Sequence, residues 1–237
     1  MFYSRPVPLQ ADAHADLRVL PGHLDFAAGA NALPLLVTEF APAVHHLPIL
    51  FAGDNAVPMA ALGFGPYNLF IKDGFWEEGV YVPAYIRRHP FILIETEGGK
   101  DYILGVEEGS DRLVRGGEEG QPLFADGKAT DLVQQVLDFC GQYTHDHEHT
   151  RAFSQALLAQ ELLATRNASV RLGDGRELNL HGFRVVDVEK FTQLPDEVVL
   201  EWHRKGWLAL VHQHLMSLGR FGDLSRRESL RAPDAAA

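Results

Sequence analysis

The amino-acid sequence predicts an α+β fold in which an antiparallel, partly barrel-like sheet is covered by C-terminal helices. Two observations carry this prediction. Up to residue 125, short apolar runs alternate with Gly, Asn, Asp and Pro, a pattern typical of strands joined by tight turns. From residue 130, apolar residues recur with helical spacing. No repeat and no Pro-rich or Ser-rich linker divides the chain, so we expect one domain over residues 1–222 and a disordered tail over 223–237.

The strands expected in the first half are short apolar runs. One pair forms a hairpin, in which residues 91–96 and 102–106 are joined by Glu97–Lys100, and the two glycines of this turn supply positive φ angles. Between Pro83 and Pro90 one helical turn is expected. The expected strands before the hairpin are Leu35–Phe40, Pro48–Phe51, Val57–Leu62 and Asn68–Ile71.

Helical periodicity begins at Thr130, which with Asp131 provides a cap and a first-turn acid. The pattern is compatible with two helices, the second over Thr150–Thr165, or with one helix that runs through the histidine-rich stretch between them. A hairpin over 169–180 follows, and residues 182–188 are expected to add a strand. The last expected helices are 195–205 and 207–218, bounded by Gly206 and Gly219.

Composition excludes several classes of protein. With 237 residues, 46% hydrophobic and 22% charged, the chain can bury a core without a metal or disulfide. The 21 Lys and Arg against 32 Asp and Glu give a net charge of −11, which argues against nucleic-acid binding. The single cysteine, Cys140, lies in an apolar helical pattern and is expected to be a buried, unreactive thiol. We expect no membrane span and a cytoplasmic location, because neither a long apolar stretch nor a secretory signal is found.

A basic and aromatic block is the first candidate site. Two adjacent arginines follow a tryptophan and two tyrosines, and such planar donors beside aromatic rings can capture a carboxylate, a phosphate or a peptide main chain. The alternative is that the arginines pair with nearby acids, such as Glu77, Glu78 and Glu95, while the tyrosines cover a sheet edge. The candidate ligand-binding residues are Trp76, Tyr81, Tyr85, Arg87 and Arg88.

The second candidate is a weak metal site. On a helix, His145 and His149 would share one face at i, i+4 spacing and could hold one metal ion if a third ligand came from elsewhere. The alternative is a solvated polar segment. His212 and His214 are two residues apart, cannot both face one ion from a helix, and are expected at a rim. No nucleophile elbow, phosphate loop or dinucleotide fingerprint is present, so we assign no catalytic residue and expect no cofactor.

Four stretches of the chain form a recognisable set: Pro6–Leu9, Glu39-Phe40 followed by Leu47–Phe51, the block from Asn68 to Phe91, and the ending Leu215-x-Ser217-Leu218. Together they resemble the SapC family of bacterial proteins. The segment Tyr-x-Pro-Ala-Tyr-x-Arg-Arg-x-Pro-Phe within the block is the most specific part.

The resemblance implies a role rather than a reaction. Family members are often encoded beside TonB-dependent receptors, flavin-dependent halogenase-like proteins and cupin-type hydroxylases, which implies an accessory function in nutrient uptake or in the modification of a peptide or aromatic compound. We therefore expect a non-catalytic cytoplasmic binding or accessory protein that recognises a protein partner or a small peptide or aromatic ligand. The alternatives are a metal-dependent enzyme acting on peptides or small molecules, and a surface-layer-associated protein, as the family name suggests.

Overall fold

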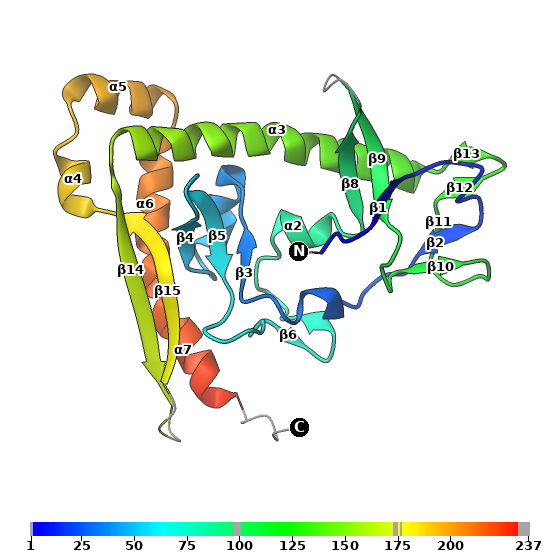
Figure 1. The fold of residues 1–237 in the computed structure, drawn as a ribbon, viewed down its shortest axis with the longest axis horizontal. Coiled ribbons are helices and arrows are strands. Elements are labelled where there is room, and N and C mark those ends of the chain that lie inside the picture. Colours follow the sequence, from blue (N-terminus) through cyan, green and yellow to red (C-terminus); the bar gives the residue numbers. More distant parts are fainter. Residues whose placement is uncertain (1, 97–100, 173–174, 176, 232–237) are drawn as a thin grey trace.

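The computed structural model describes residues 2–96, 101–172, 175 and 177–231. The molecule is elongated, and one long helix, α3, extends along most of its length (Figure 1). Helices and antiparallel sheets confirm the predicted α+β class. The helices are α1 (Phe40–Ala43), α2 (Ala84–Arg87), α3 (Asp131–Ala159), α4 (Val188–Thr192), α5 (Asp196–Arg204), α6 (Trp207–Ser217) and α7 (Phe221–Leu230), with 3-10 turns η1 (Asp25–Ala27), η2 (Val37–Glu39) and η3 (Leu218–Arg220).

The histidine-rich stretch lies inside α3, so of the two arrangements that the sequence left open, the structure has the single continuous helix, of 29 residues. The expected end at Thr165 is wrong, because α3 ends at Ala159 and Glu161 adopts a left-handed φ of 51°. Residues from Leu163 onward instead pair with a neighbouring strand, which satisfies their backbone groups through tertiary contacts.

The largest sheet is antiparallel and has the strand order β14-β15-β4-β5-β3. The predicted hairpin over 169–180 is confirmed as part of β14 and β15, and the expected additional strand over 182–188 is the continuation of β15. Strands β15 and β4 share only the pair Arg184–Phe51. The strand bounds are β3 (Ala32–Pro34), β4 (Ile49–Ala52), β5 (Val57–Ala61), β14 (Leu163–Arg171) and β15 (Glu177–Val186).

The remaining strands form small separate sheets, so the described strands close no barrel. The predicted hairpin over 91–106 is confirmed as β8 and β9, while its turn, residues 97–100, lies outside the described residues. The sheet orders are β1-β9-β8, β10-β2-β11, β12-β13 and β6-β7. The bounds are β1 (Pro6–Pro8), β2 (Leu17–Val19), β6 (Ile71–Lys72), β7 (Phe75–Trp76), β8 (Phe91–Glu95), β9 (Tyr102–Glu107), β10 (Leu113–Arg115), β11 (Gln121–Pro122), β12 (Phe124–Ala125) and β13 (Lys128–Ala129).

The predicted strand Leu35–Phe40 is wrong, because this segment forms η2 and the start of α1. The buried carboxylate of Glu39 accepts a hydrogen bond from the Leu36 amide at 2.8 Å, which closes a turn that an extended strand could not make. Glu39 itself points into the region where α2 begins, since it also accepts from the Ala84 amide.

Two clusters of buried apolar side chains lie along α3. The larger surrounds the five-stranded sheet and the C-terminal helices, and Phe153 of α3 is completely buried in it. The smaller lies under the N-terminal sheets, where Val133 and Cys140 of α3 pack with Phe91. Cys140 is only 2% exposed, and burial raises the pKa of its thiol to about 11, which leaves the thiol protonated at neutral pH. Since α3 contributes to both clusters, it joins the two ends of the molecule.

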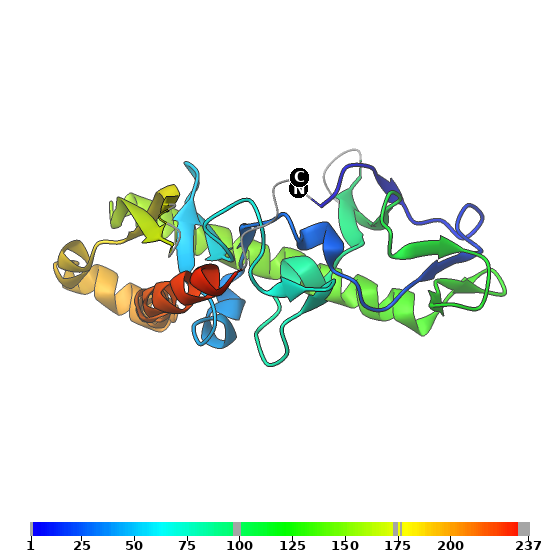
Figure 2. The same ribbon diagram turned by 90° about the horizontal axis from the view of Figure 1, so that it is seen from below.

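The C-terminal helices pack against the larger sheet, as Figure 2 shows from below. The disordered tail expected from residue 223 is wrong for residues 223–230, which form most of α7. Leu224 there is 1% exposed and the carboxylate of Glu228 accepts from the Tyr67 hydroxyl. Residues 232–237 lie outside the described residues. The expected rim position of His214 is also wrong, since its side chain is completely buried.

Candidate functional site

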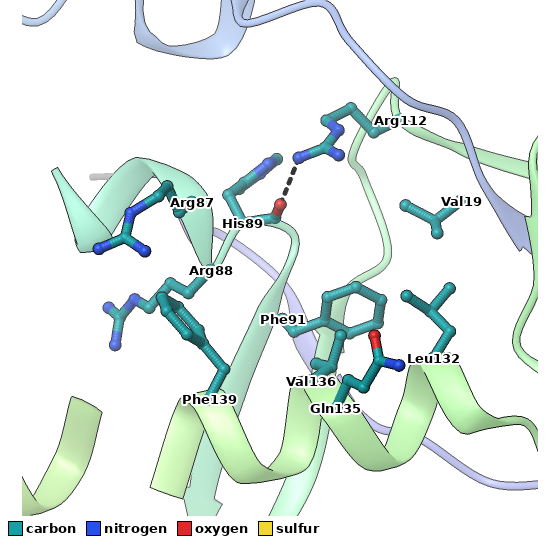
Figure 3. Close-up of a pocket in the computed structure, with 10 residues that line it drawn as sticks. All are labelled: Val19, Arg87, Arg88, His89, Phe91, Arg112, Leu132, Gln135, Val136 and Phe139. Carbon is teal, nitrogen blue, oxygen red and sulfur yellow. Dashed lines mark hydrogen bonds between the residues drawn. The ribbon is translucent and has the colours of Figure 1, made fainter. Parts of the chain in front are cut away.

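A cavity of about 330 Å³ lies where the two apolar clusters meet. The turn after α2 forms one wall and two turns of α3 form the floor (Figure 3). The lining residues are Val19, Arg87, Arg88, His89, Phe91, Arg112, Leu132, Gln135, Val136 and Phe139. Three arginines and no Asp or Glu belong to this set, so the cavity has a positive wall in a protein of net charge −11.

Arg88 lies in an aromatic cage. Its guanidinium carbon is between 4.2 and 5.1 Å from three ring centroids, those of Tyr3, Tyr85 and Tyr143. At these distances cation–π attraction stabilises the charge without an acid. Its buried Nε has no hydrogen-bond partner among the described residues.

Arg112 approaches the cavity from the opposite side and is held by backbone carbonyls. Its Nη1 donates to the oxygen of His89 at 2.5 Å, the bond drawn in Figure 3, and its Nε and Nη2 donate to the oxygen of Leu20 at 3.4 and 3.3 Å. The carbonyl partners orient the guanidinium, and the Asp111 charge acts on it without forming a salt bridge. Within the described ranges, Arg87, Arg88 and Arg112 form no salt bridge with any carboxylate.

His89 contributes a neutral ring to the cavity. Its imidazole stacks on Phe26 with centroids 3.8 Å apart. Burial, and then the nearby Arg112 charge, lower the pKa of His89 to about 4. The cationic character of the cavity at neutral pH therefore comes from the arginines alone.

The floor of the cavity is apolar. Leu132, Val136 and Phe139 follow one another along α3 at helical spacing, and Phe91 covers them from β8 (Figure 3). An anionic group at the arginines would thus leave the rest of a ligand against hydrocarbon and aromatic surface. This combination of few oriented polar groups and an apolar lining is typical of small-molecule sites.

A second cavity, of about 200 Å³, adjoins the first, and Arg87 and Phe139 line both. This second cavity contains the buried carboxylate of Glu39 and the side chain of Asp146. Its other lining residues are Leu36, Thr38, Tyr81, Ala84, Gln142 and Tyr143. The charged residues that line the first cavity are therefore all basic, whereas the second contains two acids beside Arg87.

The structure brings together four of the five predicted ligand-binding residues. The hydroxyl of Tyr81 accepts from Arg87 Nη2 at 3.2 Å, and the ring of Tyr85 lies 4.6 Å from the Arg88 guanidinium. Tyr85 lines neither cavity and reaches the site only through its contact with Arg88. Trp76 also lines neither cavity. Its ring stacks on Phe70 with centroids 5.7 Å apart, and its buried Nε1 has no partner in the described part of the chain.

The acids considered as alternative partners do not neutralise the arginine pair. Glu77 instead forms a two-bond ion pair with Arg227 of α7, which also lowers the pKa of Glu77. Tyr85 is buried in the larger cluster, and Tyr81 packs against that cluster.

The candidate metal ligands His145 and His149 lie on an exposed face of α3. Their Nε2 atoms are 3.1 Å apart, so one ring donates a hydrogen bond to the other. No third His, Cys, Asp or Glu among the described residues joins them in a group that could hold a metal ion. The predicted helical spacing is confirmed, and the third ligand that a zinc site needs is not found in that part of the chain.

Most residues that line the two cavities were not recognised from the sequence, and three of them illustrate the reasons. Phe139 follows Val136 by three positions, so helical periodicity could have placed it on the cavity floor. Arg112 precedes β10 in an irregular segment and carries no periodic signal. Its position is set by the backbone bond from the Leu20 amide to its carbonyl at 2.8 Å. Glu39 lies in a segment that was expected to be a strand.

Comparison with known proteins assigns the chain to a family. None of the helices in the described ranges combines the length and apolar character of a membrane span. No curated protein and no solved structure matches the chain. The family model described as SapC matches residues 9–224, which include both cavities and nearly every element of the fold. The chain therefore belongs to the SapC family.

Proposed function

We propose that this SapC-family protein is a non-catalytic binding protein whose ligand joins an anionic group to an apolar body. The observation that carries the proposal is the wall of three arginines without carboxylate partners, within the described residues, above an apolar floor. Guanidinium groups recognise carboxylates and phosphates by paired hydrogen bonds, and burial against Phe91 and Phe139 would stabilise the apolar part.

The lining of the first cavity favours binding over catalysis. It includes no Ser, Thr, Cys, Asp, Glu or Lys. The one group in it that could exchange a proton near neutrality is His89, and its low pKa of about 4 makes it a poor base at pH 7. The alternative of a metal-dependent enzyme gains no support from His145 and His149, which lie outside both cavities.

In the cell, we place this binding activity in the bacterial cytoplasm, as an accessory step in nutrient uptake or in the modification of a peptide or aromatic compound. The resemblance supports this part, since family members are encoded beside TonB-dependent receptors, halogenase-like proteins and cupin-type hydroxylases. A ligand with an anionic group and an aromatic body is compatible with each of these systems.

Calorimetric titration of the full chain with phenylacetate tests the proposed site. Replacing Arg112 by Gln should weaken binding at least about tenfold, because one charge-assisted contact is lost. The matched control is Arg18→Gln, since Arg18 also donates to backbone carbonyls, at Glu119 and Gly120, but lines neither cavity. Absence of phenylacetate binding, or equal loss in both variants, would overturn the proposal.

A further inference from the structure

The two cavities are neighbours along α3. Residues from Leu132 to Phe139 border the first and residues from Phe139 to Asp146 border the second. Each stretch covers about two helical turns, so at 1.5 Å per residue the centres of the two cavities lie about 10 Å apart along the helix. Phe139 marks the boundary between them.

Arg87 forms the other part of this boundary. Its guanidinium carbon lies 5.1 Å from the centroid of Phe139, and its Nε donates to the oxygen of Val82 at 3.1 Å. Tyr81 extends the connection, because its hydroxyl accepts from Arg87 and donates to Glu39 Oε1 at 2.8 Å. A chain of hydrogen bonds thus runs from the positive cavity to the negative one.

Glu39 is a built acceptor in the second cavity. Its side chain belongs to a residue only 4% exposed, and Oε1 accepts from the Ala84 amide at 2.6 Å as well as from Tyr81. Among the described residues, Oε2 accepts only from the Leu36 amide at 2.8 Å, which leaves it a free lone pair. In the described part of the chain, Arg87 is the one basic residue that lines this cavity, and its guanidinium donates to Val82 and Tyr81 rather than to Glu39.

Asp146 is fixed at the same cavity from two sides. Gln142, one turn earlier on α3, donates to Oδ1 at 2.8 Å, and the Thr38 hydroxyl donates to Oδ2 at 3.1 Å. Both partners are neutral, and no cation among the described residues forms a salt bridge with Asp146. Glu39 and Asp146 therefore line the second cavity together with Arg87, while three arginines and no acid line the first.

We infer that the ligand is a short zwitterionic peptide of about three residues, with its terminal carboxylate in the arginine cavity and its terminal ammonium group between Glu39 and Asp146. An extended peptide advances about 3.3 Å per residue, so three residues match the separation of the cavities, whereas the charges of a single amino acid are too close to reach both. An apolar central side chain would lie on Phe139. This inference rests on the proposed function and names its ligand class.

The test compares one tripeptide, Ala-Phe-Ala, with two forms that lack a terminal charge. In calorimetric titrations of the full chain, the N-acetylated form and the C-terminal amide should each bind at least about tenfold more weakly than the free peptide. Equal binding of the free and N-acetylated peptides would overturn the inference, because it would show that the ammonium group makes no contact.

A variant pair locates the ammonium group. Asp146→Asn should weaken binding of the free tripeptide and leave that of its N-acetylated form unchanged. The matched control is Asp138→Asn, because Asp138 accepts from Gln134 in the same i, i+4 arrangement but lines neither cavity. Equal effects of the two variants would contradict the placement. If phenylacetate binds in an Arg112-dependent way but no tripeptide binds, the inference of a peptide ligand is overturned and the proposed function stands. If phenylacetate does not bind either, the proposed function is overturned.

Discussion

The imidazole of His214 donates from Nδ1 to the carbonyl oxygen of Ile49, 2.9 Å away in the core. Its Nε2 accepts from the Val186 amide at 3.0 Å, which requires the neutral Nδ1–H tautomer. Strands β4 and β15 share only one residue pair, so the ring of His214 bridges backbone groups that the sheet leaves unpaired. Helix α6 is thereby bound to the sheet by hydrogen bonds as well as by apolar packing.

This bridge predicts acid sensitivity. Burial lowers the pKa of His214 to about 4 from an ordinary value near 6.5, so the unfolded chain binds the proton first as the pH falls. The contribution of neutral His214 to the free energy of unfolding is complete above pH 6.5. It declines by up to about 3 kcal/mol as the pH falls toward 4. At pH 7.5 we expect His214→Gln to have a lower free energy of unfolding than the wild type, and this difference should narrow as the pH falls. Urea denaturation at a series of pH values measures it. His203→Gln, on the exposed side of α5, is the control, and an unchanged acid slope in the His214 variant would contradict the prediction.

Ser217 completes the attachment of Ile49. Its hydroxyl accepts from the Ile49 amide at 2.9 Å and donates to the His214 carbonyl at 2.6 Å. Ser217→Ala leaves a buried amide unpaired and should lower the free energy of unfolding by about 1–3 kcal/mol. Ser229→Ala, which removes an exposed hydroxyl, should change it by less than about 0.5 kcal/mol. Equal unfolding midpoints for the two variants would argue against the bond.

The two adjacent arginines should differ in how much they contribute to stability, with Arg88 the structural residue and Arg87 the exposed one. Arg88→Ala removes contacts with three tyrosine rings and should destabilise the fold by about 2 kcal/mol. Arg87 is exposed, and Arg87→Ala should change stability by less than about 1 kcal/mol. Thermal and urea unfolding of both single variants measure this difference, and a larger loss for Arg87 would refute it.

Glu39 should show the opposite pH dependence to His214. Burial raises its pKa although hydrogen bonds from Leu36, Ala84 and Tyr81 oppose the rise. The folded chain therefore retains this proton to higher pH than the unfolded chain, and the contribution to stability falls as the pH rises through the folded-state pKa. At low pH, the free energy of unfolding of Glu39→Gln should be about 2 kcal/mol lower than that of the wild type. The reason is that one carboxyl oxygen is replaced by an amide nitrogen, which cannot accept a hydrogen bond. The deficit should narrow as the pH increases.

Denaturation of Glu39→Gln and wild type across pH 4–8 measures that change. Glu78→Gln is the control, because Glu78 is exposed: this variant removes a carboxylate but leaves the buried hydrogen bonds of Glu39 intact. A deficit for Glu39→Gln that widens with rising pH would show that its pKa is lowered in the fold rather than raised.

Local sequence patterns predicted much of the fold. Apolar alternation located β14 and β15, helical spacing located α3, and the glycines at 98–99 marked the β8–β9 hairpin. The failures have a common cause. The segments at Leu35–Phe40 and Leu163–Thr165 contain apolar residues compatible with either strand or helix, and tertiary hydrogen bonds decide between them.

The candidate site divides in the same way. Arg87, Arg88, Tyr81 and Tyr85 are close in sequence, and their aromatic and basic character alone marked them as a recognition block. Their opposing groups are distant in the chain: Arg112 lies beyond a hairpin, and Phe139 and Asp146 belong to α3. No local periodicity relates these segments, so sequence could not bring them together.

The sequence by itself determined the class of fold, the burial of Cys140 and the residues of the basic block, because these depend on composition and on short-range periodicity. Only the tertiary structure decided that α3 is continuous, that His214 is a buried bridge, and that a positive and a negative cavity meet at Phe139. These features depend on contacts between residues far apart in the chain, where burial and hydrogen bonding override local preference.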